Sequence, residues 1–271
     1  MTLEIGRTHI TTEVMKNDAW KPQQYHLFQR ERKQPYIDLR ALVRQRPAMR
    51  VLDLGCGTGE LTRELHDLLQ AAETLGIDAS DAMLAQCAAH ATAALSFRKA
   101  DIAAFEPAGP LDLVFSNAAL QWVPGHAQLL ARLSGWLGEG GQLAIQLPAM
   151  ESDVLHTVSW QVAEEEPFRT ALGGFVQHLE VHAPEWYAEQ FHALGFREQN
   201  VRLQIYPHIL PARESAIEWM KGTLLTAYQK RLTPELYAQY LARYREVLMP
   251  QLGDRDPYFL PYRRILAWGQ R

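Results

Sequence analysis

Three glycines at alternate positions form the feature of this chain that is best suited to hold a ligand. Gly55, Gly57 and Gly59 directly follow an apolar run, residues 51–54, which contains the acid Asp53. Because glycine has no Cβ, a ligand can lie directly against the main chain there. The next segment, residues 60–70, repeats leucine on one helical face. A strand joined to a helix through a glycine loop predicts a nucleotide-type site.

Two further acids follow the next strands along the chain. Asp78 ends the strand expected at 74–78, and Asp101 follows the strand expected at 95–100. The carboxyl ends of parallel strands meet at one edge of a sheet, where ligands bind. There Asp53 could accept from an ammonium group, Asp78 from ribose hydroxyls and Asp101 from an adenine amine. Asp78 could instead cap the following helix, and Asp101 could be a loop acid. Three acids at three strand ends favour the ligand-binding interpretation.

The glycine spacing separates two classes of nucleotide site. A dinucleotide-dependent oxidoreductase would show G-x-G-x-x-G, with its third glycine at the position that Glu60 occupies. That fingerprint is therefore incomplete, and a NAD-dependent enzyme becomes the weaker alternative. A glycine turn without a ligand is the other structural possibility.

Strands that alternate with helices must position these groups, and they predict an α/β fold with a doubly wound, mostly parallel sheet. Strands are expected at 50–54, 74–78, 95–100, 111–116 and 142–147, the last after a glycine turn at 138–141. The second half should add strands at 201–206 and 264–269, and a helix at 184–194. Residues 1–46 are interpreted as an arm and cap helix. Residues 47–271 form the main domain, with helical lid inserts near 150–183 and 211–252 above the strand ends.

Composition excludes several classes of function. A net charge of −4 and a pI near 6.2 give no basic surface for nucleic acid. The two cysteines, Cys56 and Cys87, form neither a disulfide framework nor a metal-ligand pattern, so no metal is expected. No apolar run approaches the roughly 18 residues of a membrane span. We expect a cytoplasmic protein with no membrane, nucleic-acid or obligate protein partner.

Four segments, taken in order, resemble the motifs of class I S-adenosylmethionine-dependent methyltransferases. They are Asp53-Leu54-Gly55-Cys56-Gly57-Thr58-Gly59, Gly76-Ile77-Asp78, Ala100-Asp101-Ile102 and Asp112-Leu113-Val114-Phe115-Ser116-Asn117. The resemblance implies a Rossmann-like fold and S-adenosylmethionine as cofactor. It also implies a set of cofactor-binding residues, namely Asp53, Gly55, Gly57, Gly59, Asp78, Asp101, Ile102 and Asn117.

More narrowly, residues 20–271 resemble the trans-aconitate 2-methyltransferase family. The segments that carry this likeness are Tyr25-His26-Leu27-Phe28, Glu31-Arg32, Asn117-Ala118-Ala119-Leu120-Gln121-Trp122-Val123-Pro124, Gln146-Leu147-Pro148, Ile217-Glu218-Trp219 and Pro261-Tyr262-Arg263-Arg264-Ile265-Leu266. Residues 116–122 are also similar to malonyl-acyl-carrier-protein methyltransferases. The resemblance implies esterification of a carboxylate of a small polycarboxylic acid, with trans-aconitate as the expected acceptor. Two alternatives stay open: another small-acid methyltransferase, and an S-adenosylmethionine-binding protein without catalysis.

A carboxylate acceptor sets simple chemical requirements. Its pKa lies near 4, so it is ionised at pH 7 and needs no general base. The sequence accordingly shows no catalytic triad, and we expect positioning rather than acid–base catalysis. Cations should hold a polyanion. The expected substrate residues are the basic side chains Arg32, His208, Lys221, Arg263 and Arg264 and the aromatic side chains Tyr25, Phe28 and Trp122. Each could instead be a solvated charge or a packing residue. Because side chains alternate along a strand, at most one of Arg263 and Arg264 should face the site.

Overall fold

A seven-stranded sheet forms the centre of the computed structural model, which describes residues 29–150 and 153–271. The strand order is β3-β2-β1-β4-β5-β7-β6. The first five strands of this order pair in parallel, whereas β7 is antiparallel to both of its neighbours. The strands are β1 (Arg50–Leu54), β2 (Glu73–Asp78), β3 (Leu95–Lys99), β4 (Leu111–Asn117), β5 (Leu137–Pro148), β6 (Glu198–Leu210) and β7 (Tyr258–Gln270).

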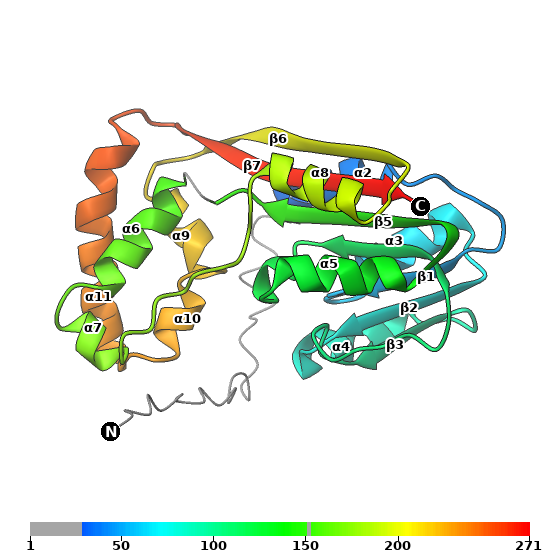
Figure 1. The fold of residues 1–271 in the computed structure, drawn as a ribbon. Coiled ribbons are helices and arrows are strands. Elements are labelled where there is room, and N and C mark those ends of the chain that lie inside the picture. The colour runs from blue at the N-terminus through cyan, green and yellow to red at the C-terminus, as the bar shows by residue number, and fades with distance from the viewer. Residues whose placement is uncertain (1–28, 151–152) are drawn as a thin grey trace, which may run out of the picture.

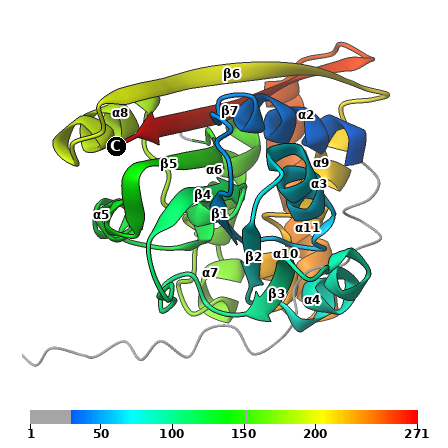
Figure 2. The ribbon, with the colours of Figure 1, turned by 90° about the vertical axis from the view of Figure 1, so that its right-hand side faces the viewer.

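Helices cover both faces of this sheet (Figures 1 and 2). One face carries α5 (His126–Gly135) and α8 (Pro184–Ala193), and the other carries α2 (Gln29–Arg40), α3 (Glu60–Leu69) and α4 (Asp81–Cys87). Apolar side chains from α5 and α8 form one core with the strands, and those from α2 and α3 form a second. The expected doubly wound α/β fold with a mostly parallel sheet is confirmed.

A separate group of helices lies beyond the carboxyl ends of β4 and β5 (Figure 1). We call it the helical cap. It consists of α6 (Val154–Ala163), α7 (Phe168–Ala171), α9 (Ser215–Lys221), α10 (Thr226–Gln229), α11 (Pro234–Leu248) and η3 (Met249–Leu252). The cap has its own apolar core. Its buried tyrosines remain hydrogen-bonded, since the hydroxyl of Tyr240 donates to Ser159 O at 2.7 Å and that of Tyr244 to Leu155 O at 2.8 Å. No described helix combines the length and apolarity that a membrane span requires.

The last two strands are longer than their sequence pattern indicates. Only residues 264–270 of β7 pair with β5, whereas the whole of β7 pairs with β6. The first part of β7 and the last part of β6 therefore leave the sheet as a two-stranded ribbon that reaches the helical cap (Figure 1). Pro207 and Pro261 lie opposite each other in this ribbon and interrupt the apolar alternation that predicts a strand.

The glycine turn predicted at residues 138–141 is wrong. These residues belong to β5, where Leu137 pairs with Leu111 across a register shift. The glycines serve close packing in the strand, because a Cβ on Gly141 would lie 2.9 Å from Gly138 O. The glycine cluster therefore marks an irregular stretch of strand and not a turn.

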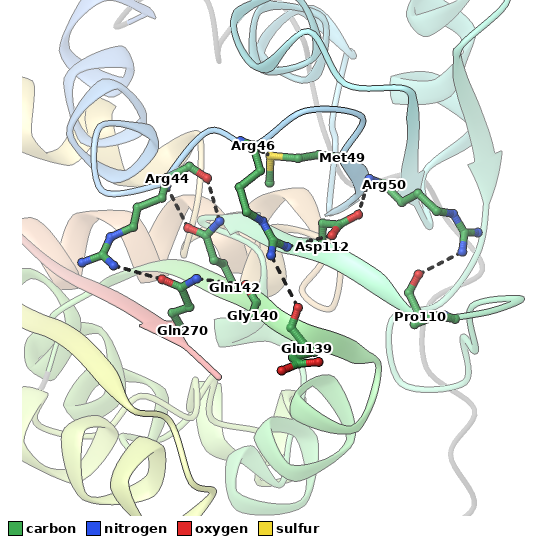
Figure 3. A network of polar contacts seen from close by, with 10 residues as sticks. All are labelled: Arg44, Arg46, Met49, Arg50, Pro110, Asp112, Glu139, Gly140, Gln142 and Gln270. Atoms are coloured by element: carbon green, nitrogen blue, oxygen red, sulfur yellow. Dashed lines mark hydrogen bonds and ion pairs between the residues drawn. The ribbon is translucent and has the colours of Figure 1, made fainter.

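A polar network fastens the loop between α2 and β1 to the amino-terminal edge of the sheet (Figure 3). Gln142 at its centre is completely buried. Its Oε1 accepts from Arg44 N at 2.8 Å and from Trp268 Nε1 at 2.9 Å, and its Nε2 donates to Arg44 O at 2.8 Å. Nearby, Asp112 accepts from Arg46 Nη2 at 2.7 Å and from Arg50 N at 2.8 Å. The charged residues at the amino-terminal edge therefore have a structural role. The candidate site lies at the opposite, carboxyl edge of the sheet.

Candidate active site

The glycine loop connects β1 to α3 at the carboxyl edge of the sheet, and its three glycines serve different purposes. All three have positive φ angles, between 56° and 81°. A Cβ on Gly55 would lie 2.2 Å from Ala119 Cβ, and one on Gly59 would lie 2.9 Å from the ring of Phe97. Among the described residues, nothing lies within 4 Å of a Cβ on Gly57. Internal packing therefore requires Gly55 and Gly59, whereas the space beside the Gly57 Cα is open and could admit a ligand.

Asp78, at the end of β2, holds this loop in place. Its Oδ2 accepts from Gly57 N at 2.9 Å and its Oδ1 accepts from Ser80 N at 2.9 Å. The capping role belongs to Ser80, whose hydroxyl accepts from Met83 N at the start of α4. A carboxylate can accept about four hydrogen bonds. Asp78 can therefore support the loop and still accept from a ligand.

Asp53, near the end of β1, is a buried acid with only 5% of its surface exposed. The Thr62 hydroxyl donates to its Oδ2 at 2.6 Å. Burial raises the pKa of the Asp53 carboxyl to about 7, and the nearby charge of Asp78 adds to this effect, while the hydrogen bond from Thr62 opposes it. A cationic ligand group would supply the opposite charge that this carboxylate needs once it is ionised.

The third strand end is more open. Asp101 is exposed, and its Oδ1 accepts from Ala103 N at 2.8 Å in the turn after β3. Ile102 is half-buried beside it, and its carbonyl accepts from Arg132. Asp101 is therefore partly a loop acid that holds its own turn. Its carboxylate nevertheless lies at the same sheet edge as Asp53 and Asp78.

A cavity of about 260 Å³ lies between the sheet edge and the helical cap. Three carboxamides on the sheet side each bury a polar atom that has no hydrogen-bond partner in the described part of the chain: Asn117 Oδ1, Gln121 Oε1 and Gln146 Nε2. Buried polar atoms are normally paired, so these atoms indicate a place for a bound ligand. The same segment joins cavity and glycine loop, because Ala118 lines the cavity and Ala119 packs on Gly55.

Two arginines of β7 border this cavity. Arg264 is only 8% exposed, and its guanidinium carbon lies 3.8 Å from the centre of the Tyr262 ring. Arg263 borders the cavity as well. Alternation along the strand leads us to expect only one of them there. Both nevertheless border the cavity, and Ala149 N donates to Arg263 O at 3.1 Å, which joins the segment after β5 to β7 at this wall.

The structure brings some of the other expected substrate residues to the cavity and leaves others away from it. Trp122 lines the cavity. The ring of His208 packs instead between Trp219 and Tyr262, with centroids 5.6 and 5.0 Å away. Lys221 forms an ion pair with Glu218 at 2.6 Å and borders a different hollow between α9 and α11. Tyr25, Phe28 and the side chain of Arg32 lie outside the described part of the chain.

Several polar residues of the cavity wall are not among those that the sequence predicts for the site. They include Gln146, which belongs to a family motif, and the pair Asp153 and His156. His156 Nδ1 lies 2.7 Å from Asp153 Oδ2 at the start of α6. The D-x-x-H spacing before a helix was the available signal, and it resembles an ordinary helix cap.

His126, Glu180 and His182 form a second polar cluster, away from the cavity. Their possible ligand atoms lie within 4.8 Å of one another. These atoms have internal partners: His126 bonds to Tyr187 Oη at 2.8 Å and Leu120 O at 3.0 Å, and Glu180 accepts from the first amides of α5. Burial lowers the pKa of His126, which favours its neutral form. The cluster fastens the start of α5 to the segment before α8.

Comparison with known proteins places this site in a family. A family model described as "Methyltransferase domain" matches residues 51–141, which span the glycine loop and the first five strands as far as β5 begins. A trans-aconitate 2-methyltransferase from Deinococcus radiodurans is 41% identical over 254 residues, which cover 92% of this chain and 96% of that protein. The chain belongs to the trans-aconitate 2-methyltransferase family. Another trans-aconitate 2-methyltransferase, from Streptomyces avermitilis, is 36% identical over 259 residues, 92% of this chain and 96% of that protein.

Solved structures share the fold of this trans-aconitate 2-methyltransferase family member at low sequence identity. The YcgJ protein from Bacillus subtilis matches with a TM-score of 0.59 and 17% identity, over 88% of this chain and 98% of that one. A phosphoethanolamine N-methyltransferase from Haemonchus contortus, in complex with S-adenosyl-L-methionine, matches with a TM-score of 0.52 and 17% identity, over 88% and 52%. The expected family, fold class and methyltransferase class are confirmed.

Proposed function

We propose that this protein transfers a methyl group from S-adenosylmethionine to a carboxylate of trans-aconitate. The observation that carries the proposal is the cavity beside the glycine loop, which combines two arginines with three unpartnered carboxamide atoms. Such a lining suits a small, highly charged acid better than an apolar substrate. The full-length similarity to trans-aconitate 2-methyltransferases supports the same acceptor.

The methyl donor is S-adenosylmethionine, and the residues at the strand ends fit it. The space beside the Gly57 Cα is open, and the buried Asp53 carboxylate lacks a cationic partner in the described structure. Asp53 would hold the ammonium group, Asp78 the ribose hydroxyls and Asp101 the adenine amine. When bound, the cofactor supplies an electrophilic methyl group on a positively charged sulfur.

The work of the chain is then to bind and orient the acceptor. A carboxylate is already ionised at neutral pH, so no side chain has to remove a proton from it. Arg264 and Arg263 would hold carboxylates that do not react, and enclosure in the cavity would remove water from the one that does. Alignment of the acceptor oxygen with the methyl carbon at roughly 3–3.5 Å would account for catalysis by positioning.

Turnover of radiolabelled S-adenosylmethionine by the purified protein tests the proposal. Trans-aconitate, cis-aconitate, citrate, isocitrate and a malonyl thioester would be compared as acceptors. We expect a base-labile methyl ester that forms selectively from trans-aconitate. Binding of S-adenosylmethionine without turnover of trans-aconitate would refute the acceptor, and selective turnover of the malonyl thioester would favour the alternative enzyme.

A pair of arginine variants tests the role of the cavity. Arg264→Gln should raise KM for trans-aconitate by about 10- to 100-fold, because a charge-assisted hydrogen bond is lost. Arg245→Gln is the matched control, since Arg245 borders the separate hollow between α9 and α11. Both variants should bind S-adenosylmethionine like the wild type in calorimetry, which also shows that they are folded. An unchanged KM in Arg264→Gln would remove this arginine from the acceptor site.

A further inference from the structure

An aspartate–histidine pair at the start of α6 forms part of the cavity wall. Asp153 caps the helix, since its Oδ1 accepts from Leu155 N at 3.0 Å. Its Oδ2 lies 2.7 Å from His156 Nδ1. Because a carboxylate oxygen accepts, the His156 nitrogen that faces it carries the proton. The helix cap thus fixes the carboxylate, and the carboxylate fixes the orientation of the imidazole.

The other nitrogen of this imidazole is available to the cavity. His156 lines the cavity together with Asp153, and its side chain is 13% exposed. In the described part of the chain, His156 Nε2 has no hydrogen-bond partner, and it is not among the fully enclosed polar atoms. The helical cap therefore contributes a ring nitrogen to the same space that Arg263 and Arg264 border from β7.

Charge decides what this nitrogen can bind. With a neutral imidazole, the pair carries the full negative charge of Asp153 and repels an anionic acceptor. With a protonated imidazole, the pair is neutral overall and presents an N–H donor from Nε2.

We propose that His156 binds a carboxylate of the acceptor as an imidazolium, with Asp153 as its positioning residue. The inference rests on the proposed function, because it assumes that the cavity takes a polycarboxylate. The arginines of β7 and the histidine of the cap then hold carboxylates from two walls of one cavity. The acceptor would then bridge the helical cap and the sheet edge.

The groups around His156 allow a pH dependence of acceptor binding to be assigned to this residue. Arg263 and Arg264 face the cavity from β7, and Tyr258 lies on the same ribbon. His178 packs on the ring of Trp160 at 5.0 Å, and His156 lies 6.4 Å from that ring. Arginine stays charged and tyrosine stays neutral between pH 5 and 8, whereas an imidazole ordinarily changes charge in this range. His178 does not line the cavity and provides a matched control.

Steady-state kinetics at saturating S-adenosylmethionine, from pH 6 to pH 8, tests the proposal. For the wild type we expect KM for trans-aconitate to rise with pH while kcat changes little. His156→Gln should raise KM at pH 6 by about tenfold or more and should flatten its pH dependence. Asp153→Asn keeps the helix cap but removes the carboxylate that orients the imidazole, so it should also raise KM at pH 6 while kcat and cofactor binding are retained. His178→Gln should retain the wild-type profile.

The outcomes separate this inference from the proposed function. A wild type that methylates trans-aconitate, together with a His156→Gln variant of unchanged KM and unchanged pH profile, would refute the role of His156 alone. A variant that loses kcat, cofactor binding and thermal stability together would show a structural role and would also refute it. A wild type that does not methylate trans-aconitate would refute the proposed function, and the inference would fall with it.

Discussion

Asp53 should destabilise the folded protein at neutral and alkaline pH, and its replacement by asparagine should relieve that cost. Burial raises the pKa of this carboxyl from 3.8 to about 7. Between these values the unfolded chain has lost the proton that the folded chain still holds. Stability therefore falls as the pH rises through this window and levels off once the folded carboxyl is also ionised.

The two pKa values give the size of the effect. A pKa difference of about 3 corresponds to roughly 4 kcal/mol of unfolding free energy above pH 7. About 1.5 kcal/mol of this is already lost at pH 5, because the unfolded carboxyl is mostly ionised there. Asp53→Asn removes the titration and keeps an oxygen that can accept from Thr62. The unfolding free energy of the variant minus that of the wild type should thus increase by about 3 kcal/mol from pH 5 to pH 8.

Urea denaturation of both proteins at pH 5, 6, 7 and 8, without cofactor, measures this difference. Asp67→Asn is a suitable control, because Asp67 is an exposed acid that pairs with Arg63 on the surface of α3. Its difference from the wild type should stay nearly constant with pH. A constant difference for Asp53→Asn as well would refute the reasoning, since it would mean that the carboxyl is not destabilised in its ionised form.

The same substitution should impair function while it improves stability. The charge that costs stability in the free protein is the charge that we propose to bind the ammonium group of the cofactor. S-adenosylmethionine affinity of the wild type should therefore increase as the pH rises towards 7, and Asp53→Asn should weaken it by at least about tenfold. Calorimetric titration at pH 6 and pH 8 measures both effects. A variant that is more stable at pH 8 and still binds the cofactor normally would place the ammonium group elsewhere.

Two further predictions use matched pairs of variants. Gly57→Ala should remain folded, with a strain cost of about 1 kcal/mol for its positive φ, but should lose cofactor binding. Gly59→Ala should instead lower the melting temperature, because its Cβ has no room. The reverse pattern in calorimetry and thermal melts would contradict the assignment of the glycines. Gln142→Met should cost about 1–3 kcal/mol, because it leaves the buried Trp268 Nε1 and the two partly buried main-chain groups of Arg44 without their partner. Gln199→Met on the exposed face of β6 should change the urea midpoint little. A small effect of Gln142→Met would mean that water replaces the lost amide.

The sequence could predict the cofactor side of this protein because that side is built from local signals. An apolar strand, a glycine loop and an acid at each strand end are all read from short segments. The purpose of each glycine could not be read in this way. Gly59 is required by Phe97, 38 positions later along the chain, and Gly55 is required by Ala119. Only the folded structure, in which these distant residues meet, shows that one glycine of the motif serves packing while another can serve the ligand.

The acceptor side could not be predicted with the same certainty, because its wall is assembled from distant elements. Arg264 comes from β7, His156 from α6 and Gln146 from the end of β5. Nothing in the local pattern distinguishes Arg264, which reaches the cavity, from Lys221, which pairs with Glu218 on another surface. The alternation of side chains along a strand does not predict the outcome either, since the neighbours Arg263 and Arg264 both border the cavity. For a polyanionic acceptor, specificity therefore depends on how the helical cap meets the sheet, and variants at that contact should change KM before they change cofactor binding.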